Sequence, residues 1–322
     1  MSESVDCLVV GTGPVGMVAA CALAQKGLTV GLAGPEAIPE RDGRTVAILD
    51  SGVKLLETLG LWGNARDVSA PLIEMRIIDD TGSLFRAPPV TFRASELGLD
   101  AFGQNIELTD LVAQLARVSK SQTNLKQWSE AVTGFKRRSN DVIEAELASG
   151  VTIECGMLIG ADGRNSKVRE FAGIQSKDWH YPQTALTAIF SHERDHDDRS
   201  TEFHTRSGPF TLVPLKGKRS SLVWMMAPKE AERLSKRSHG DFARAVEKQA
   251  HSLLGKMTLE TKIGTVPMSG LSTDHYAKEK IAVIGEAAHV FPPIGAQGLN
   301  LGLRDIDSLM KAIDKGTDLN AL

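Results

Sequence analysis

The sequence predicts an α/β protein in which a Rossmann-like nucleotide-binding domain carries β-rich insertions. An apolar run at residues 5–10 ends in a Gly-x-Gly-x-x-Gly motif, and an alanine-rich helical stretch at 17–26 follows directly. A second apolar run at 28–33 completes the order strand, glycine turn, helix, strand of a dinucleotide-binding unit. Two further glycine-bearing turns begin at 160 and 285, each after a run of strand-type residues.

Each glycine of the first motif has its own expected function. Gly11 permits the tight turn from strand to helix, Gly13 lets the backbone approach a diphosphate, and Gly16 allows close packing of helix and strand. Together with Pro14 they form the start of a helix, whose free N–H groups and positive dipole end favour a diphosphate. The alternative is a glycine-rich turn in some other α/β protein.

A dinucleotide fold places an acid after the second strand, where it binds the adenosine ribose. Here Gly34 and Pro35 follow that strand, and Glu36 is the first acid. Glu36 reaches the ribose from a displaced loop, or it is a solvated loop acid; the sequence leaves both open.

Composition excludes several classes of protein. A net charge of −3 over 322 residues argues against a nucleic-acid binder, which would show a concentrated basic face. The 3 cysteines form no metal-type pair, so we expect reduced core thiols and no metal site. No apolar run approaches the ~20 residues that span a bilayer, and the N-terminus has no signal-peptide pattern. These features predict a cytoplasmic protein, either soluble or peripheral on a membrane.

Between the first and second glycine turns the pattern alternates between helix and strand. Thr109 is expected to cap the second helix of this region. The expected elements are a polar loop with a basic core at 41–48, a helix at 51–59, short strands within 73–93, a helix at 110–118, and strands at 131–138, 142–148 and 151–159.

The second turn, 160–169, combines small residues, Asp162 and Gly163 with a basic helix start, so it is a second place where phosphate or ribose can meet backbone. A β-rich stretch follows, and the third segment extends from Gly285 to Asp305. The expected elements after the second turn are strands at 184–192, 201–205, 210–214 and 221–226, a helix at 242–254, and a strand at 280–284. The nucleotide-binding domain is then discontinuous, with parts at 1–70, 99–175 and 276–322; the substrate domain comprises 71–98 and 176–275.

In this order and spacing the three segments resemble the FAD-dependent aromatic hydroxylases, the para-hydroxybenzoate-hydroxylase-like flavoproteins. The first matches that family's FAD-binding glycine motif, and Asp162-Gly163 is similar to its Asp-Gly motif, which serves both FAD and the nicotinamide cofactor. Residues 285–289 are similar to its Gly-Asp-Ala-Ala-His motif, with Glu286 in place of aspartate. Within the family, stretches 44–49, 208–215, 221–224 and 292–300 most resemble the ubiquinone-biosynthesis hydroxylases.

The resemblance implies a flavin monooxygenase that uses O2 and NAD(P)H and hydroxylates an aromatic ring through a C4a-hydroperoxyflavin. The implied substrate is a polyprenylated phenol in ubiquinone biosynthesis. Pro293, Gly295 and Gly298 would lie beside the flavin, and no catalytic acid or base is named; His289 is expected to be structural, bonded to local backbone. The implied FAD contacts are Gly11, Gly13, Pro14, Gly16, Glu36, Arg44, Gln104, Asp162, Gly163, Gly285, Glu286, Pro293, Gly298, Leu299 and Asn300.

Two alternatives stay open: a hydroxylase of a small soluble aromatic, and a non-catalytic subunit of a biosynthetic assembly. The chain stops soon after the third motif, whereas relatives continue through further helices, so we expect those helices to be truncated. Phe210, Leu212, Pro214 and Trp224 line the substrate pocket or simply pack the sheet.

A polyprenyl tail requires a membrane surface or a protein that delivers it. The best basic helical region, 229–256, is mixed in charge. We therefore expect delivery within a ubiquinone-biosynthesis assembly, or docking of the missing helices on the inner membrane, rather than direct lipid binding.

Overall fold

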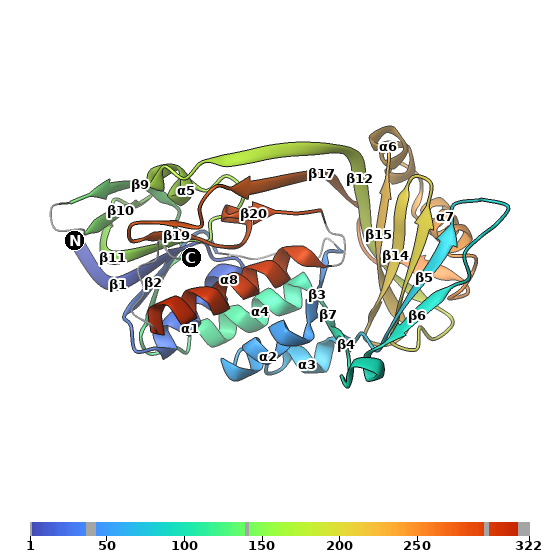
Figure 1. The fold of residues 1–322 in the computed structure, drawn as a ribbon, viewed down its shortest axis with the longest axis horizontal. Coiled ribbons are helices and arrows are strands. Elements are labelled where there is room, and N and C mark those ends of the chain that lie inside the picture. The colour runs from blue at the N-terminus through green and yellow to red at the C-terminus, as the bar shows by residue number, and fades with distance from the viewer. Residues whose placement is uncertain (1, 37–42, 139–141, 293–295, 315–322) are drawn as a thin grey trace.

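The computed structural model describes residues 2–36, 43–138, 142–292 and 296–314. Two large β-sheets lie at opposite ends of the molecule (Figure 1). The long strands β12 (Ser176–His192) and β17 (Gly264–Thr273) pair with one another and run between the two halves of the molecule (Figure 1). This pair therefore joins the two halves of the fold.

The first sheet has a parallel centre. In the described chain its order is β18-β19-β11-β1-β2-β8, and β1 pairs in parallel with both β11 and β2. Its strands are β1 (Ser2–Val10), β2 (Val30–Ala33), β8 (Leu125–Trp128), β9 (Val132–Arg137), β10 (Ile143–Leu147), β11 (Thr152–Gly160), β18 (Ala277–Lys278) and β19 (Ile281–Val283). The predicted α/β class is confirmed.

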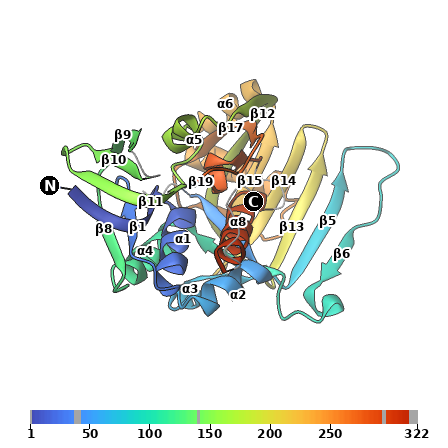
Figure 2. The ribbon, with the colours of Figure 1, turned by 60° about the vertical axis from the view of Figure 1, so that its left-hand side comes forward.

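Helices cover both faces of this sheet. α1 (Pro14–Gln25) is buried continuously from Gly16 to Ala24. A helix surrounded by neighbours needs apolar side chains on all sides, which explains the apolar residues of this stretch. α1 packs beside α4 (Leu108–Ser119) and α8 (Gln297–Asp314), as Figure 2 shows for α1 and α8. The shorter helices are α2 (Asp50–Thr58), α3 (Ala65–Val68) and α5 (Lys167–Ala172).

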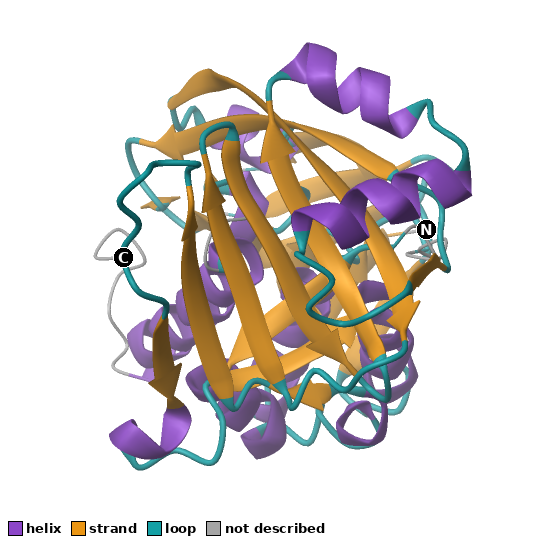
Figure 3. Cartoon of the chain, turned by 90° about the vertical axis from the view of Figure 1, so that its right-hand side faces the viewer, coloured by secondary structure: helices purple, strands orange, loops and turns teal. Residues whose placement is uncertain are grey.

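The second sheet is mostly antiparallel and has a hydrophobic core of its own on one face. Its order is β20-β17-β12-β15-β14-β13-β5-β6, and two helices, α6 (Pro228–Ser235) and α7 (His239–Gln249), cover one face (Figure 3). Its remaining strands are β5 (Glu74–Asp80), β6 (Val90–Arg93), β13 (Arg199–Thr205), β14 (Gly208–Leu215), β15 (Arg219–Met226), β16 (Met257–Leu259) and β20 (His289–Val290).

A small third sheet connects the halves: β3 (Thr45–Leu49), β7 (Gly103–Glu107) and β4 (Ala70–Pro71). Asn105 of β7 donates to the carbonyl oxygen of Pro214 at 2.8 Å, and the Thr45 hydroxyl donates to Ser221 Oγ at 2.8 Å. These bonds fix the second sheet against the nucleotide-binding half.

Several local predictions are wrong. The predicted helix at 242–254 is α7, which ends at Gln249, and α6 and β17 are not among the predicted elements. Residues 45–48, predicted as loop, form β3, because Ile48 is fully buried and the segment pairs with β7. Thr109 does not cap α4, since the helix begins at Leu108 and its N-cap is Glu107. The domain limits stay a prediction; β20, from the third predicted part of the nucleotide domain, pairs with β17 of the second sheet.

Candidate functional site

The three glycine-bearing turns meet at one edge of the first sheet. β19, β11 and β1 are adjacent and parallel, and one turn follows the carboxyl end of each. The turns are linked, because Ala161 N–H donates to Val10 at 2.8 Å and Ile284 N–H donates to Gly160 at 2.9 Å. Ligands of open α/β sheets bind outside the carboxyl ends of the strands, so this edge is the candidate site.

Two glycines of the first turn are required by the protein's own packing. Gly11 has φ +119°, and a β-carbon there would lie 2.1 Å from the carbonyl oxygen of Ala161. A β-carbon on Gly16 would lie 1.8 Å from the oxygen of Gly11. Neither position has room for any other residue.

Gly13 is different, because nothing in the described part of the chain requires a glycine there. Its φ of −68° suits any residue, and no atom of the described residues lies within 4 Å of the β-carbon it lacks. It is the N-cap of α1, which has no side-chain cap and no acid in its first turn. An uncapped helix N-terminus facing open space fits a diphosphate, which would bond the free N–H groups of Val15 and Gly16 and avoid the donorless Pro14.

Asp162 has its carboxylate engaged within the second turn. It accepts hydrogen bonds from the backbone N–H groups of Lys167 at 2.8 Å and Val168 at 3.2 Å, and from the Ser166 hydroxyl. These bonds cap α5 and hold the turn in place. Gly163 has φ +80°, and no atom of the described residues lies within 4 Å of its missing β-carbon.

The third turn is held by Asp305 of α8. Its Oδ2 accepts from Gly285 N–H at 2.8 Å and from His289 Nε2 at 2.7 Å. The expected bond of His289 to local backbone is wrong, because its partner is the Asp305 carboxylate; a structural role for His289 stays a prediction. Its buried Nδ1 has no hydrogen-bond partner within the described chain. Burial, and then the Asp305 charge, raise the pKa of the nearby Tyr276.

Glu286 stands out in this turn because it is exposed and makes no hydrogen bond or ion pair with any described residue. Its neighbours Gly285 and Ala287 are buried. An acceptor presented from a fixed turn, with no partner of its own within the described chain, fits a ligand with hydroxyl groups.

Asn300, in the first turn of α8, has a role that the motif reading missed. Its side-chain oxygen accepts from Leu49 N–H at 2.9 Å, and its amide donates to Ala47 at 2.8 Å and to Ala296 at 2.6 Å. The side chain thus braces the start of α8 against β3 and leaves only its backbone for a ligand. Among the described residues, no atom lies within 4 Å of the missing β-carbon of Gly298, and Leu299 is half-buried. Pro293 and Gly295 lie outside the described residues.

Three further predicted contacts, Arg44, Gln104 and Glu36, are among the described residues. Arg44 is exposed directly before β3, and Gln104 of β7 accepts from the Ser69 hydroxyl at 3.2 Å. Glu36 is exposed and 3.6 Å from Lys120 Nζ, and the Thr12 hydroxyl donates to the neighbouring Pro35 carbonyl. The loop after β2 is thereby held against the first glycine turn, which keeps Glu36 near the site.

The predicted substrate lining is wrong. Phe210 is fully buried and its ring meets Trp224 at 5.1 Å, inside the core under α7 that also contains Leu212. Pro214 is also buried, and it lies on the same face of the strand as Phe210 and Leu212, because alternate residues of a strand share a face. Of the two alternatives left open, sheet packing is the one that the structure shows.

The opposite face of the sheet is turned toward the nucleotide-binding half. It presents Thr211, Val213 and Val223, which are half-buried, and Ser221, which meets Thr45 of β3. Thr187 of β12 is directly cross-strand from Val223, and its buried Oγ1 has no hydrogen-bond partner in the described chain. A substrate between the two halves would meet these residues.

Other chemistry is sparse in the part of the chain that the structure describes. Burial raises the pKa of the free thiols of Cys21 and Cys155 to about 12, so both are inert core groups. No group of three or more potential metal ligands occurs among these residues. None of their helices is long and apolar enough to cross a membrane.

The fold and this site define a dinucleotide-binding protein with an antiparallel sheet set against the nucleotide domain. The chain belongs to the family described as FAD binding domain, which matches residues 4–316. It is an FAD-dependent monooxygenase of the ubiquinone hydroxylase group.

Two curated relatives show this group. The ubiquinone hydroxylase UbiL of Rhodospirillum rubrum is 32% identical, over 96% of this chain and 72% of its own length. The 3-demethoxyubiquinol 3-hydroxylase of Escherichia coli is 30% identical, over 97% of this chain and 80% of its own length.

Solved structures share the fold. PqsL of Pseudomonas aeruginosa, in complex with 2-aminobenzoylacetate, superposes with a TM-score of 0.82 at 21% identity, over 97% of this chain and 86% of that one. The p-nitrophenol 4-monooxygenase PnpA of Pseudomonas putida gives a TM-score of 0.77 at 17% identity, over 98% and 82%.

Proposed function

We propose that this monooxygenase hydroxylates the aromatic ring of a polyprenylated phenol in ubiquinone biosynthesis, with O2 and NAD(P)H as co-substrates. The similarity to the two ubiquinone-pathway hydroxylases, along nearly the whole chain, supports the substrate class. The reaction would take place at the cytoplasmic surface of the inner membrane, where such a substrate resides, or within an assembly of pathway proteins.

The observation that carries the cofactor assignment is the open space at Gly13. The N–H groups at the start of α1 would hold the diphosphate of FAD, and Glu286 would accept hydrogen bonds from the ribityl hydroxyls. Arg44, Gln104, Glu36 and the turn at 162–163 would complete the cofactor's surroundings.

When bound, FAD supplies the chemistry of reduction by NAD(P)H and activation of O2. The protein would position and polarise the flavin and the substrate, and it would exclude water from the site. The first turn of α8, at Gly298 and Leu299, presents the positive end of a helix dipole, which favours nearby negative charge by about 0.3–1 kcal/mol. Asn300 keeps that turn in place through its bonds to β3.

The substrate ring would lie against the inward face of the second sheet. Val213 and Val223 supply apolar contact that excludes water, and the unpartnered Thr187 hydroxyl is placed to bond a ring hydroxyl or keto group. No carboxylate or imidazole is assigned to a proton transfer.

Two measurements test this proposal. The purified protein should be yellow, and denaturation should release FAD; protein that stays colourless after incubation with FAD would favour a non-catalytic subunit. A deletion strain should accumulate a polyprenylated precursor that lacks one ring hydroxyl, and the wild-type gene, but not a Gly13→Val variant, should restore the quinone. An unchanged quinone profile, with turnover of a soluble phenol by the enzyme, would favour the small-aromatic alternative.

A further inference from the structure

The loop between β5 and β6 exposes apolar side chains at the outer edge of the second sheet. β6 is the last strand in the sheet order, and the loop projects beyond the body of the molecule (Figure 2). Leu84 and Phe85 within it are 92% and 88% exposed, the highest values among the large apolar side chains of the described residues. Such exposure is costly in water, so it indicates a surface that is covered when the protein functions.

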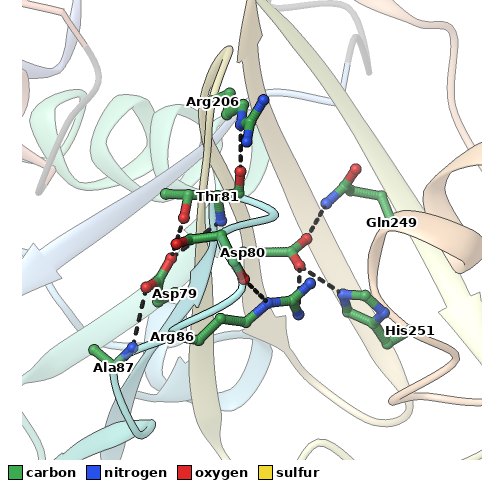
Figure 4. Close-up of polar contacts among 9 residues, drawn as sticks. Asp79, Asp80, Thr81, Arg86, Ala87, Arg206, Gln249 and His251 are labelled. Carbon is green, nitrogen blue, oxygen red and sulfur yellow. Dashed lines mark hydrogen bonds and ion pairs between the residues drawn. The ribbon is translucent and has the colours of Figure 1, made fainter.

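This loop has a braced base. Asp79 accepts from both the N–H and the hydroxyl of Thr81, at 3.1 and 2.7 Å, and from Ala87 N–H at 3.1 Å (Figure 4). One carboxylate therefore ties together the two ends of the loop. Arg206 of the next hairpin donates through Nε to the Thr81 carbonyl at 2.5 Å. The fold thus holds Leu84 and Phe85 outward on a fixed base.

A pocket of about 230 Å³ opens beside the base of the loop, with Arg76 and Arg86 in its lining and Phe203 among its apolar walls. Asp80, the one carboxylate among the described residues of this lining, is already engaged: it accepts from Gln249 at 2.7 Å and from His251 Nε2 at 3.0 Å, and Arg86 lies 3.6 Å away (Figure 4).

Unlike Asp80, Arg76 has no hydrogen-bond or ion-pair partner among the described residues. Its Nε is buried and makes no hydrogen bond within the described chain, and no ion pair to its guanidinium occurs there. A buried donor of this kind is costly unless a ligand satisfies it. The pocket therefore carries an uncompensated cation that fits an anionic oxygen group.

We propose that the β5–β6 loop and this pocket form a docking surface for an anionic lipid bilayer. Leu84 and Phe85 enter the boundary between headgroups and acyl chains, while Arg76 and Arg86 bind a lipid phosphate. Apolar residues next to arginines match the two layers that a bilayer presents, which a protein partner has no general reason to do. The inference rests on the proposed function in one respect, that a polyprenylated substrate resides in a membrane.

The basic helices are not the docking element. Ala231 and Leu234 of α6, and Phe242 and Val246 of α7, are buried in the core of the second sheet. Their apolar faces are thus already used. The proposed loop surface departs from the expectation, drawn from the sequence, of delivery by an assembly or docking of further helices rather than direct lipid binding.

Vesicle flotation of the flavin-loaded full chain tests the proposal. The protein should float with vesicles of phosphatidylcholine mixed with phosphatidylglycerol, less with phosphatidylcholine alone, and less at high salt. The double variant Leu84→Ser, Phe85→Ser should lose most of this binding. Arg76→Gln should weaken it about fivefold, as expected for one arginine near an anionic surface.

Two variants serve as matched controls. Leu97→Ser removes an apolar side chain that is 70% exposed at the other end of the hairpin, and Arg233→Gln removes a 65% exposed arginine on α6. Both should float like the wild type, and all variants should keep their flavin and Tm. The proposal is overturned if the wild-type protein does not float, and equally if it binds a pathway protein in place of the vesicles. Loop variants that float normally also overturn it. Flotation needs no turnover, so a failure of the proposed function would leave this result unaffected.

Discussion

A β-carbon on Gly11 would lie 2.1 Å from the carbonyl oxygen of Ala161, which belongs to the second glycine turn. The two turns are therefore in contact through backbone alone. Gly16 packs on Gly11 in the same way. Of the three glycines in the first motif, Gly11 and Gly16 are required by packing within the described residues, whereas Gly13 is not; the proposed diphosphate site would explain it.

This difference predicts opposite results for two substitutions. Gly13→Val should lose FAD and keep a Tm near that of the wild-type apoprotein, because the new side chain enters space that the diphosphate needs. Gly11→Ala should destabilise the fold by at least about 1–3 kcal/mol, because backbone must move. Flavin content and thermal melting check both. Normal flavin content in Gly13→Val would show that the diphosphate lies elsewhere.

Asp305 should be needed for the third turn to keep its shape. Asp305→Ala removes the acceptor for Gly285 N–H and for His289, and a hydrogen bond to a charged group contributes about 1.5–3 kcal/mol. We expect a lower Tm and weaker FAD binding. The pKa of Tyr276 should also fall toward its ordinary value, measured by ultraviolet titration, because the Asp305 charge contributes to its raised value.

Asp307→Ala is the matched control for that variant. It lies on the same helix, with a side chain 52% exposed that pairs only with Lys311 in the described structure. Its Tm and flavin affinity should equal those of the wild type. If both variants behaved alike, Asp305 would not hold the turn.

Glu286 should contribute directly to FAD affinity. If it bonds the ribityl hydroxyls, Glu286→Ala should weaken FAD binding by up to about 1.5–3 kcal/mol, the range for a hydrogen bond to a charged group. Glu286→Asp should bind at least as well as the wild type, since aspartate is the residue of the resembled motif. Fluorescence titration of the apoprotein with FAD measures both, with Glu230→Ala on α6 as an exposed control. Unchanged affinity in Glu286→Ala would exclude this contact.

What the sequence predicts well here is local. The strand, glycine turn and helix at 5–26 follow from apolar periodicity and from backbone needs within one segment, and each is present in the structure. Asn300 was assigned to the site, but its braces to Leu49 and Ala47 depend on β3, which precedes it by some 250 residues. No pattern within the third motif reveals such a partner.

The face of the second sheet also escaped prediction for a physical reason. Alternation along 210–226 separates two sets of residues, but which set meets the helices depends on where α7 packs. The sequence left open whether Phe210 and Trp224 line the substrate pocket or pack the sheet, and α7 covers that face of the strands and leaves the smaller residues on the other face (Figure 3). The exposure of Leu84 and Phe85 could not be predicted either, because a short apolar pair in a sequence does not show whether its side chains are buried or exposed.

Phe210 should therefore matter for stability rather than for substrate. Phe210→Ala empties a fully buried site against Trp224 and should cost about 3–5 kcal/mol. Val223→Phe, on the inward face, should instead keep the Tm and the flavin while it reduces substrate-stimulated NAD(P)H oxidation. A Phe210→Ala protein with normal melting and impaired substrate binding would contradict this assignment of the two faces.

Thr187 provides the sharpest test of the substrate position. Its Oγ1 is buried, has no partner in the described chain and lies on the face that Val223 shares. Thr187→Val keeps the shape and removes the hydroxyl, so it leaves no new cavity and should not lower the Tm. If the hydroxyl bonds the substrate ring, KM should rise by the loss of one neutral hydrogen bond, about 0.5–1.5 kcal/mol or roughly 2- to 13-fold. Thr187→Ser should restore most of that affinity, because it returns the hydroxyl, and FAD affinity should be equal in all three proteins. A Thr187→Val enzyme with unchanged KM and raised Tm would show that the hydroxyl is only a buried polar group, and that the ring lies elsewhere on the sheet.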